Sequence, residues 1–235
     1  MAIKWIFFDL DDTLFDFAAS SLKSLRALWA EQECIRKVFP TPDAFIEEYH
    51  IHNARMWQLH ERGEITSAFL QPERFRLTLW PELDGSRVLE ESQRLNDRYL
   101  DLLAQCPAPC PGAEQLLKSL SRHYLIGVLT NGFRAVQYRK LATMGLSRYI
   151  QRTVISEEIG IQKPDVRLFR HAERATGATP NTALMIGDNP ANDVQGAIDA
   201  GWHAIYYDCK SKPFQSSSPL FLGKVTDLRD VPLRM

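Results

Sequence analysis

The sequence has no apolar run long enough to cross a membrane, and it has only four cysteines among its 235 residues. A membrane-spanning helix needs about 18 or more consecutive apolar residues, so this class of protein is excluded. Four cysteines in a chain of this length do not make the disulfide framework of a small secreted domain. The N-terminal segment turns acidic at Asp9, too soon for a signal peptide. We therefore expect a cytoplasmic protein with reduced thiols.

The chain also has no excess of charge of either sign. Lys and Arg together number 28, Asp and Glu number 29, and the formal net charge is -1. This balance gives no electrostatic reason to expect a nucleic-acid polymer or a membrane as partner. An anionic substrate would have to be bound by local groups. Nothing in the sequence indicates an oligomeric state.

Several motifs of other chemistries are missing. There is no GxGxxG after a predicted strand, no GxxxxGK[ST], no HExxH and no GxSxG. Cys106 and Cys110 flank Pro-Ala-Pro at a spacing unlike the usual zinc pairs. We interpret these two residues as reduced thiols around a proline-rich connector.

The hydrophobic pattern divides the chain into two kinds of segment. A short aromatic and β-branched run at 4–9 predicts a buried strand. Helical periodicity and helix caps then predict four helices with no strand between them, at 20–32, from 41 onwards, at 67–79 and at 86–103. Beyond the proline-rich segment 106–112, helices and strands alternate. The helices are expected at 113–122, 134–144, 166–176 and 192–200, and the strands at 124–130, 152–155, 183–188 and 203–207, with a last edge element at 224–228.

This alternation predicts an α/β fold, a doubly wound parallel sheet covered by helices on both faces. The first strand needs partners, which only the C-terminal part can supply. We therefore predict an α/β core made of residues 1–15 and 109–235, with residues 16–108 inserted as a helical domain.

Polar residues follow the ends of the predicted strands. The first strand ends in Asp9-Leu10-Asp11-Asp12-Thr13, the second in Thr130-Asn131-Gly132 and the fourth in a loop from Gly187 to Asp193, while Lys163-Pro164 follows the third. Ligands of open parallel sheets bind at the carboxyl ends of the strands. As many as five carboxylates would meet there, which is costly unless a cation neutralises them.

These residue types predict phosphoryl chemistry. Asp9 with Asp188 offers the sparse carboxylate ligation that Mg²⁺ favours, with positions left for water and phosphate oxygens. Lys163 would bind the same phosphate as a point charge. The Thr130 hydroxyl and nearby backbone N–H groups, at Asn131 and Gly132, would complete the substrate-binding cradle.

Four motifs in this order resemble the haloacid dehalogenase (HAD) superfamily: Asp-Leu-Asp-Asp-Thr-Leu after a hydrophobic run, then Leu-Thr-Asn-Gly, Lys-Pro and Gly-Asp-Asn-Pro-Ala-Asn-Asp. The resemblance covers the whole predicted α/β core. It implies a Rossmann-like HAD core, and the insertion after the first motif resembles the superfamily's helical cap of the first type.

The resemblance implies a role for each motif residue. Asp9 would be the nucleophile that forms an aspartyl-phosphate. Asp11 would be the general acid and base, and its backbone carbonyl would be a metal ligand beside Asp9 and Asp188. Thr130 and Lys163 would complete the catalytic set. Asp193 would orient metal-bound water or Lys163 from the second shell of the metal.

Other residues are interpreted without chemistry. Asp12 would fix the turn after the first strand, and Asn192 would cap the following helix. A dehalogenase of the same superfamily would not need Asp11, because a halide leaves without a proton. A receiver domain also gathers Asp and Lys at strand ends, but it would be about half as long and would lack the helical insertion.

Three longer stretches, at 56–66, 130–133 and 154–164, are similar to the branch of house-cleaning pyrimidine 5'-nucleotidases. This implies a Mg²⁺-dependent phosphomonoester hydrolase whose substrate is a small phosphorylated metabolite, a nucleoside monophosphate above others. The alternatives are a phosphatase for sugar phosphates, phosphoglycolate or another metabolite, a phosphomutase, and a binding protein without catalysis. No residue of the inserted helices identifies a base.

Overall fold

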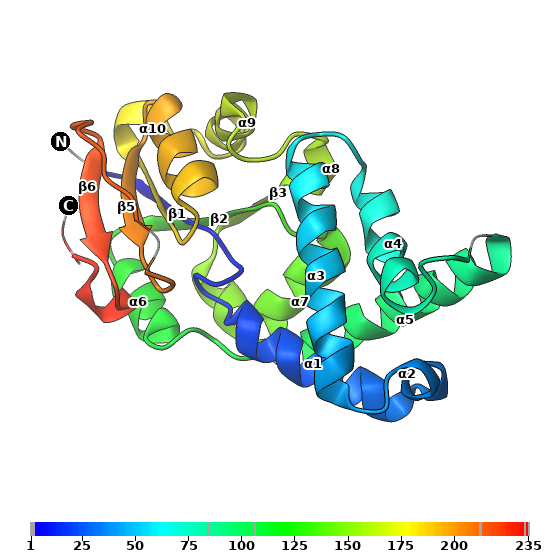
Figure 1. Cartoon of the computed structure of the whole chain (residues 1–235). Helices are drawn as coiled ribbons and strands as arrows, with labels where there is room; N and C mark the ends of the chain where they lie inside the picture. Colours follow the sequence, from blue (N-terminus) through cyan, green and yellow to red (C-terminus); the bar gives the residue numbers. More distant parts are fainter. Residues whose placement is uncertain (1–2, 84, 106, 212, 233, 235) are drawn as a thin grey trace. The chain divides into compact units, whose positions relative to one another are not determined.

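The structure is a computed structural model that describes residues 3–83, 85–105, 107–211, 213–232 and 234 (Figure 1). The chain separates into two compact units: Met1–Phe17 with Pro107–Met235, and Ala18–Cys106. We call them the α/β unit and the helical unit. Their assignment as a catalytic core and a cap stays a prediction.

The α/β unit is built on a parallel sheet of six strands in the order β3-β2-β1-β4-β5-β6. The predicted fold class is therefore confirmed. Because β1 pairs with β2 on one side and with β4 on the other, the direction of winding reverses at β1. The strands are β1 (Trp5–Phe8), β2 (Leu125–Thr130), β3 (Arg152–Ile155), β4 (Ala183–Gly187), β5 (His203–Tyr207) and β6 (Phe221–Val225).

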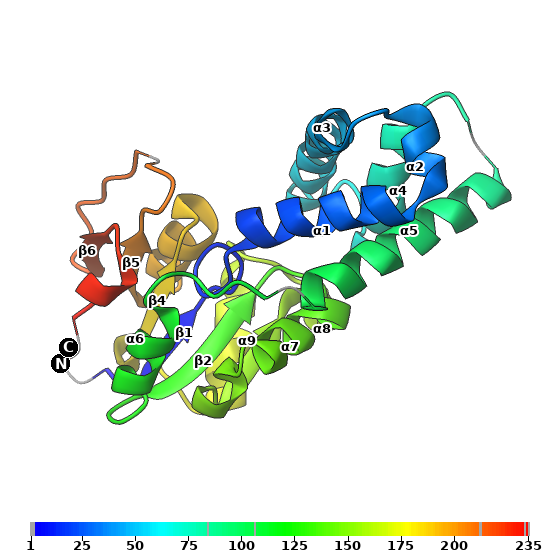
Figure 2. The ribbon, with the colours of Figure 1, turned by 90° about the horizontal axis from the view of Figure 1, so that it is seen from below.

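Helices cover both faces of this sheet, as a parallel sheet requires. They are α6 (Ala113–Leu120), α7 (Arg134–Thr143), α8 (Ser156–Ile159), α9 (Val166–Thr176) and α10 (Gly196–Asp199). Figure 1 shows α9 and α10 on one face and α6 and α7 on the other, and Figure 2 views the face of α6 and α7. Under α9, the rings of Phe7 and Phe169 lie 4.8 and 5.3 Å from that of Trp202, which is fully buried.

The segment predicted as one helix at 192–200 differs in detail. It begins earlier, as a π-helical segment at Pro190–Gln195, and continues as α10. The cap is Asn189, whose Oδ1 accepts hydrogen bonds from the N–H groups of Ala191 and Asn192, so the interpretation of Asn192 as the cap is wrong. The sequence offers two Asn residues three positions apart, and Pro190 at the first helical position fixes the choice.

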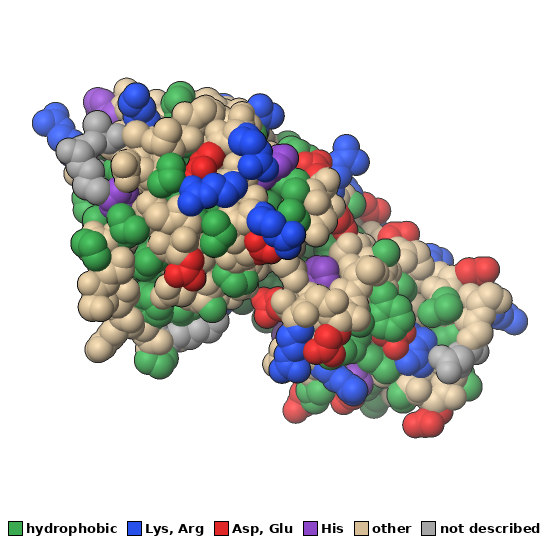
Figure 3. Space-filling model, turned by 90° about the horizontal axis from the view of Figure 1, so that it is seen from above, with side chains coloured by type: hydrophobic (Ala, Val, Ile, Leu, Met, Phe, Trp, Pro, Cys, Tyr) green, Lys and Arg blue, Asp and Glu red, His purple; other side chains and the backbone are tan. Residues whose placement is uncertain are grey.

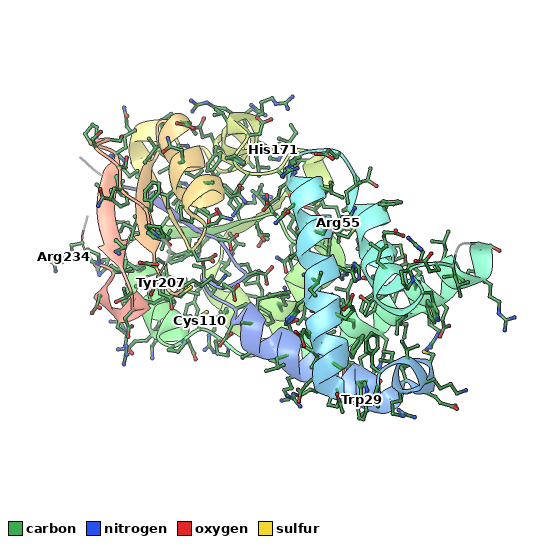
Figure 4. All side chains as sticks on the ribbon, viewed as in Figure 1. Trp29, Arg55, Cys110, His171, Tyr207 and Arg234 are labelled. Carbon is green, nitrogen blue, oxygen red and sulfur yellow. The ribbon has the colours of Figure 1, made fainter. Side chains whose placement is uncertain are left out.

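The helical unit contains α1 (Phe17–Glu31), α2 (Glu33–Val38), α3 (Pro42–Glu61), α4 (Ser67–Leu79) and α5 (Ser86–Gln105). Four helices were predicted here, and the prediction is wrong because it missed α2. This helix has six residues and buries only Ile35, too little for a helical period to show in the sequence. Figure 4 labels Trp29 on α1 and Arg55 on α3. Among the described residues, no helix combines the length and the apolar character that a membrane crossing needs.

Side chains of both charges mix on the face drawn in Figure 3, as the balanced composition predicts. Cys34, Cys110 and Cys209 are free thiols, and Cys106 lies outside the described residues. Cys110, labelled in Figure 4, is buried, and burial raises the pKa of its thiol. A thiol of raised pKa is a poor nucleophile.

Candidate active site

The site residues lie where the sheet reverses its winding. Asp9 follows the end of β1, Thr130 ends β2, and Asp188 follows the end of β4. Since β1 lies between β2 and β4, these three positions are at neighbouring strand ends. Backbone pairing extends one residue past β1, because the N–H of Asp9 donates to the carbonyl of Ile186 at 2.9 Å. The sheet itself therefore positions the carboxylate of Asp9.

Lys163 is the centre of the charged cluster. Its Nζ lies 2.6 Å from Asp9 Oδ1 and 2.6 Å from Asp193 Oδ1, and the side chain is 2% exposed. Asn131 fixes the backbone of this lysine: its Oδ1 accepts from the Lys163 N–H at 2.9 Å, and its Nδ2 donates to the Lys163 carbonyl at 3.0 Å. The side chain of Asn131 is thus occupied by Lys163. The predicted substrate contact of Asn131 stays a prediction for its main-chain N–H.

Asp193 is held in place by the loop after β4. Its Oδ2 accepts a hydrogen bond from the Asn189 N–H at 2.9 Å. A Cβ atom on Gly187 would lie 2.3 Å from this oxygen, so only glycine leaves room for the carboxylate. Gly187 is therefore required for the Asp193 carboxylate to pack against the end of β4.

Asp9, Asp188 and Asp193 are all buried and can bring one carboxylate oxygen each within 4.8 Å of the others. Burial raises the pKa of Asp9 well above its usual range, against the opposing charge of Lys163. Burial, followed by the charge of Asp193, raises the pKa of Asp188 to about 6. The ionised forms are therefore destabilised, and a further cation would relieve this cost.

Lys210 is a second cation at these strand ends, and it belongs to none of the four motifs. Its Nζ lies 2.9 Å from Asp188 Oδ2 and 2.5 Å from Asp12 Oδ2. Asp12 also accepts the Phe17 N–H through Oδ1 at 3.0 Å and adopts a positive φ of 59°. These contacts agree with the structural role expected for Asp12.

Asp11 faces α7 rather than the Lys163 cluster. Its Oδ1 lies 2.5 Å from the Nζ of Lys140, and its Oδ2 accepts from Gln137 Nε2 at 2.9 Å. The same amide donates to Thr130 Oγ1 at 2.8 Å, and the Gly132 N–H donates there at 3.1 Å. Sequence reasoning missed Gln137 and Lys140. Their signal was the spacing of three on one helical face, directly after the Thr-Asn-Gly motif.

The predicted site residues thus fall into two adjoining groups. The first contains Asp9, Asn131, Lys163, Asp188 and Asp193. The second contains Asp11, Thr130 and Gly132. The catalytic, substrate and metal roles of these residues stay predictions, but their proximity is what phosphoryl transfer requires: a carboxylate nucleophile, cationic and hydroxyl groups for a phosphate, and a second carboxyl for proton transfer.

Comparison with known protein families matches residues 3–201 to the haloacid dehalogenase-like hydrolases. The chain belongs to this family. The predicted resemblance and the predicted type of enzyme, a HAD phosphatase, are confirmed.

Individual relatives extend this result. The chain is 36% identical over 202 residues to the pyrimidine 5'-nucleotidase YjjG of Escherichia coli, a match that covers 86% of this chain and 84% of the relative. It is 33% identical to the pyrimidine 5'-nucleotidase PynA of Streptococcus pneumoniae, over 88% of this chain and 85% of the relative. The crystal structure of the HAD-hydrolase YfnB of Bacillus subtilis bound to magnesium is similar with a TM-score of 0.82 and 25% identity, over 97% of this chain and 96% of that one.

Proposed function

We propose that this protein is a Mg²⁺-dependent phosphomonoester hydrolase that acts through an aspartyl-phosphate on nucleoside 5'-monophosphates, with pyrimidine nucleotides preferred. One observation carries the proposal. Lys163 Nζ lies 2.6 Å from both Asp9 and Asp193 in a buried cluster at the strand ends. A fixed cation beside a buried nucleophilic carboxylate is the arrangement that binds a phosphate and transfers it.

In the first step, an Asp9 carboxylate oxygen attacks phosphorus and the bond from phosphorus to the ester oxygen breaks. Lys163 contacts Asp9 Oδ1, which leaves Oδ2 for the attack. Asp11 gives a proton to the departing alkoxide, so the alcohol leaves neutral. Lys163 and the Thr130 hydroxyl bind the phosphoryl oxygens and stabilise their negative charge.

In the second step, the aspartyl-phosphate is hydrolysed. Asp11, now ionised, takes a proton from water as the water oxygen attacks phosphorus. The bond between phosphorus and the Asp9 oxygen breaks, and inorganic phosphate leaves. Asp11 ends protonated and Asp9 ionised, so both are ready for another substrate.

The buried carboxylates fit a Mg²⁺ ion. Lys163 and Lys210 contact four carboxylates, those of Asp9, Asp193, Asp188 and Asp12, so with all four ionised these six groups have a net negative charge that a divalent cation would neutralise. We propose Asp9, Asp188 and the Asp11 carbonyl as its ligands, with Asp193 behind them. When bound, the ion supplies positive charge that polarises the phosphate oxygens.

The relatives named above support a nucleotide as the substrate, since two of them are pyrimidine 5'-nucleotidases that match more than four fifths of this chain. The partner is then a small phosphorylated metabolite. The cytoplasmic location expected from the sequence stays a prediction.

Phosphate release tests the proposal. The purified protein with Mg²⁺ is assayed against pyrimidine and purine 5'-monophosphates, sugar phosphates, phosphoglycolate and 4-nitrophenyl phosphate, and kcat/KM values are compared because specificity is their ratio. We expect the highest value for pyrimidine 5'-monophosphates. A higher value for a sugar phosphate would replace the substrate, and transfer to a sugar instead of water would identify a phosphomutase. No turnover of any ester would contradict the enzyme mechanism.

A further inference from the structure

The carboxylate of Asp11 is held at both oxygens by two side chains from one helix. Lys140 contacts Oδ1 at 2.5 Å and Gln137 contacts Oδ2 at 2.9 Å. The two residues are three positions apart on α7, so they lie on the same face of the helix. Both are almost fully buried, Gln137 at 0% and Lys140 at 2% exposed.

Lys140 is fixed by more than its ion pair. Its Nζ lies 4.5 Å from the ring centroid of Phe15 and 5.4 Å from that of Phe17. Both rings belong to the segment that follows Asp11 in the chain. Cation–π contacts of this kind hold a buried ammonium in place. The ammonium therefore has a defined position against Asp11.

Gln137 joins Asp11 to Thr130. Its amide nitrogen donates to Asp11 Oδ2 and, at 2.8 Å, to Thr130 Oγ1, which also accepts the Gly132 N–H. A hydroxyl oxygen accepts two hydrogen bonds and donates one. Both acceptor positions of Thr130 are filled, so its remaining capacity is to donate its proton.

Gly132 leaves the space that the Gln137 amide needs to reach Asp11 and Thr130. A Cβ atom at position 132 would lie 2.0 Å from Gln137 Nε2 and 3.1 Å from Asp11 Oδ2. Any side chain there would displace the amide from Asp11 and Thr130. The glycine of the Thr-Asn-Gly motif is thus needed for the contact between α7 and the site.

We infer that Gln137 and Lys140 are positioning residues of the reaction: Lys140 orients Asp11 for proton transfer, and Gln137 orients both Asp11 and the Thr130 hydroxyl that binds phosphate. The inference rests on the proposed function of Asp11. A carboxylate has about four lone-pair positions, so a clamped Asp11 retains positions for the proton it exchanges. Neither side chain needs to touch the substrate.

Lys140→Met tests the first role through the leaving group. In the first step, nitrophenolate can leave with little help from a general acid, whereas the alkoxide of a nucleotide needs a proton from Asp11. In the second step, both esters need Asp11 as the base. We expect kcat/KM for uridine 5'-monophosphate to fall roughly 10-fold to 100-fold, because a misoriented Asp11 would lose part of its contribution as a general acid. For 4-nitrophenyl phosphate we expect kcat/KM to stay within about 3-fold, while kcat falls and about one equivalent of nitrophenolate appears as a burst.

Gln137→Met tests the second role. We expect kcat/KM to fall for both esters, because the phosphate loses an oriented hydroxyl. The affinity for inorganic phosphate, measured by calorimetry with Mg²⁺, should fall roughly 10-fold, as for a lost hydrogen bond to a charged group. Lys140→Met should leave this affinity within about 2-fold, since Thr130 keeps its contacts.

The controls are Gln115→Met and Lys118→Met, which alter exposed residues of α6 in the same unit and should leave kinetics unchanged. Lys140→Arg keeps the charge and should recover part of the lost activity. Circular dichroism and thermal melting confirm that each variant is folded, and if Lys140→Met fails to fold, Lys140→Arg and Gln137→Met carry the same comparison.

Equal losses of kcat/KM for the two esters in Lys140→Met, without a burst, would overturn the role of Lys140. Unchanged phosphate affinity in Gln137→Met would overturn the role of Gln137. Failure of the proposed substrate is separate: if wild type hydrolyses another alkyl phosphate, that ester replaces the nucleotide. If it hydrolyses no ester, the proposed function fails, and with it the role of Lys140, while phosphate affinity still decides on Gln137.

Discussion

The α/β unit and the helical unit both bury cationic side chains, and they surround them with different groups. In the α/β unit, Lys163 and Lys140 are each 2% exposed and contact carboxylates, Lys163 those of Asp9 and Asp193 and Lys140 that of Asp11. The carboxylates of these ion pairs belong to residues that follow the ends of the strands. Their partners are the groups to which we assign the chemistry.

In the helical unit, the buried cation is Arg74 of α4, which is also 2% exposed. Its guanidinium donates to the amide oxygens of Asn53 on α3 and Asn96 on α5, at 3.1 and 2.7 Å. Aromatic rings pack around it, with centroids 5.3 to 5.8 Å away: Tyr49, Phe75 and Tyr99. This cation joins three helices through neutral groups. We therefore expect Arg74 to serve packing, whereas the two lysines contact the carboxylates to which we assign the chemistry.

The strongest test of this division is Asp9→Asn. The amide keeps the size of the carboxylate and removes its nucleophilicity, so turnover should fall by roughly 10⁴-fold or more, as for other lost nucleophiles. The fold should remain, because Lys163 keeps Asp193 as a partner. Phosphate release and thermal melting measure the two effects. A folded and active Asp9→Asn protein would refute the assignment of the nucleophile.

Removal of Mg²⁺ comes next in size. A metal ion supplies several kcal/mol of charge stabilisation, so chelation with EDTA should lower phosphate release by at least roughly 100-fold. Added Mg²⁺ should restore it. The helical unit should melt unchanged if its cation serves packing alone. Full activity after exhaustive chelation would remove the metal from the mechanism.

Much of the fold was predictable because the sheet is buried and its strands and helices alternate clearly. The elements Arg152–Ile155, Val166–Thr176 and His203–Tyr207 have the predicted bounds. What failed was short or irregular: α2 buries one residue, and the π-helical segment has no period of its own in the sequence. The edge element expected at 224–228 begins earlier, as β6 at Phe221–Val225.

The site was predictable where motif residues follow strands, because strand ends in a parallel sheet converge. Lys140 and Lys210 were missed because neither belongs to one of the four motifs, and their partners are distant in the chain. Lys140 is 129 residues from Asp11, and Lys210 is 198 residues from Asp12. A lysine in a helix or loop has a solvated alternative, so only the folded chain shows which one contacts a carboxylate.

Arg74→Met tests whether the buried cation of the helical unit serves packing alone. The substitution removes hydrogen bonds between three helices and leaves Asn53 and Asn96 without the guanidinium. We expect the free energy of unfolding to fall by about 2 to 4 kcal/mol, as for buried polar networks. The kcat/KM of the folded protein for 4-nitrophenyl phosphate should stay within about 2-fold, because packing alone is altered.

Arg55→Met is the matched control on α3, since Arg55 is exposed. Its effect on unfolding should stay within about 0.5 kcal/mol. Denaturant unfolding measures both variants. A large loss of kcat/KM in Arg74→Met without a loss of stability would place Arg74 with the reacting groups and break the division between the units.

The smallest expected effect belongs to a neutral group of the helical unit. Thr41 caps α3, and its Oγ1 accepts the Ala44 N–H at 3.3 Å. Thr41→Ala removes this acceptor from the first turn, which should cost about 1 kcal/mol of unfolding free energy. Thr41→Ser keeps the oxygen and is the control. Because this hydrogen bond lies within the first turn of α3, we expect kcat/KM not to change. A kinetic effect from Thr41→Ala alone would mean that the start of α3 takes part in substrate binding.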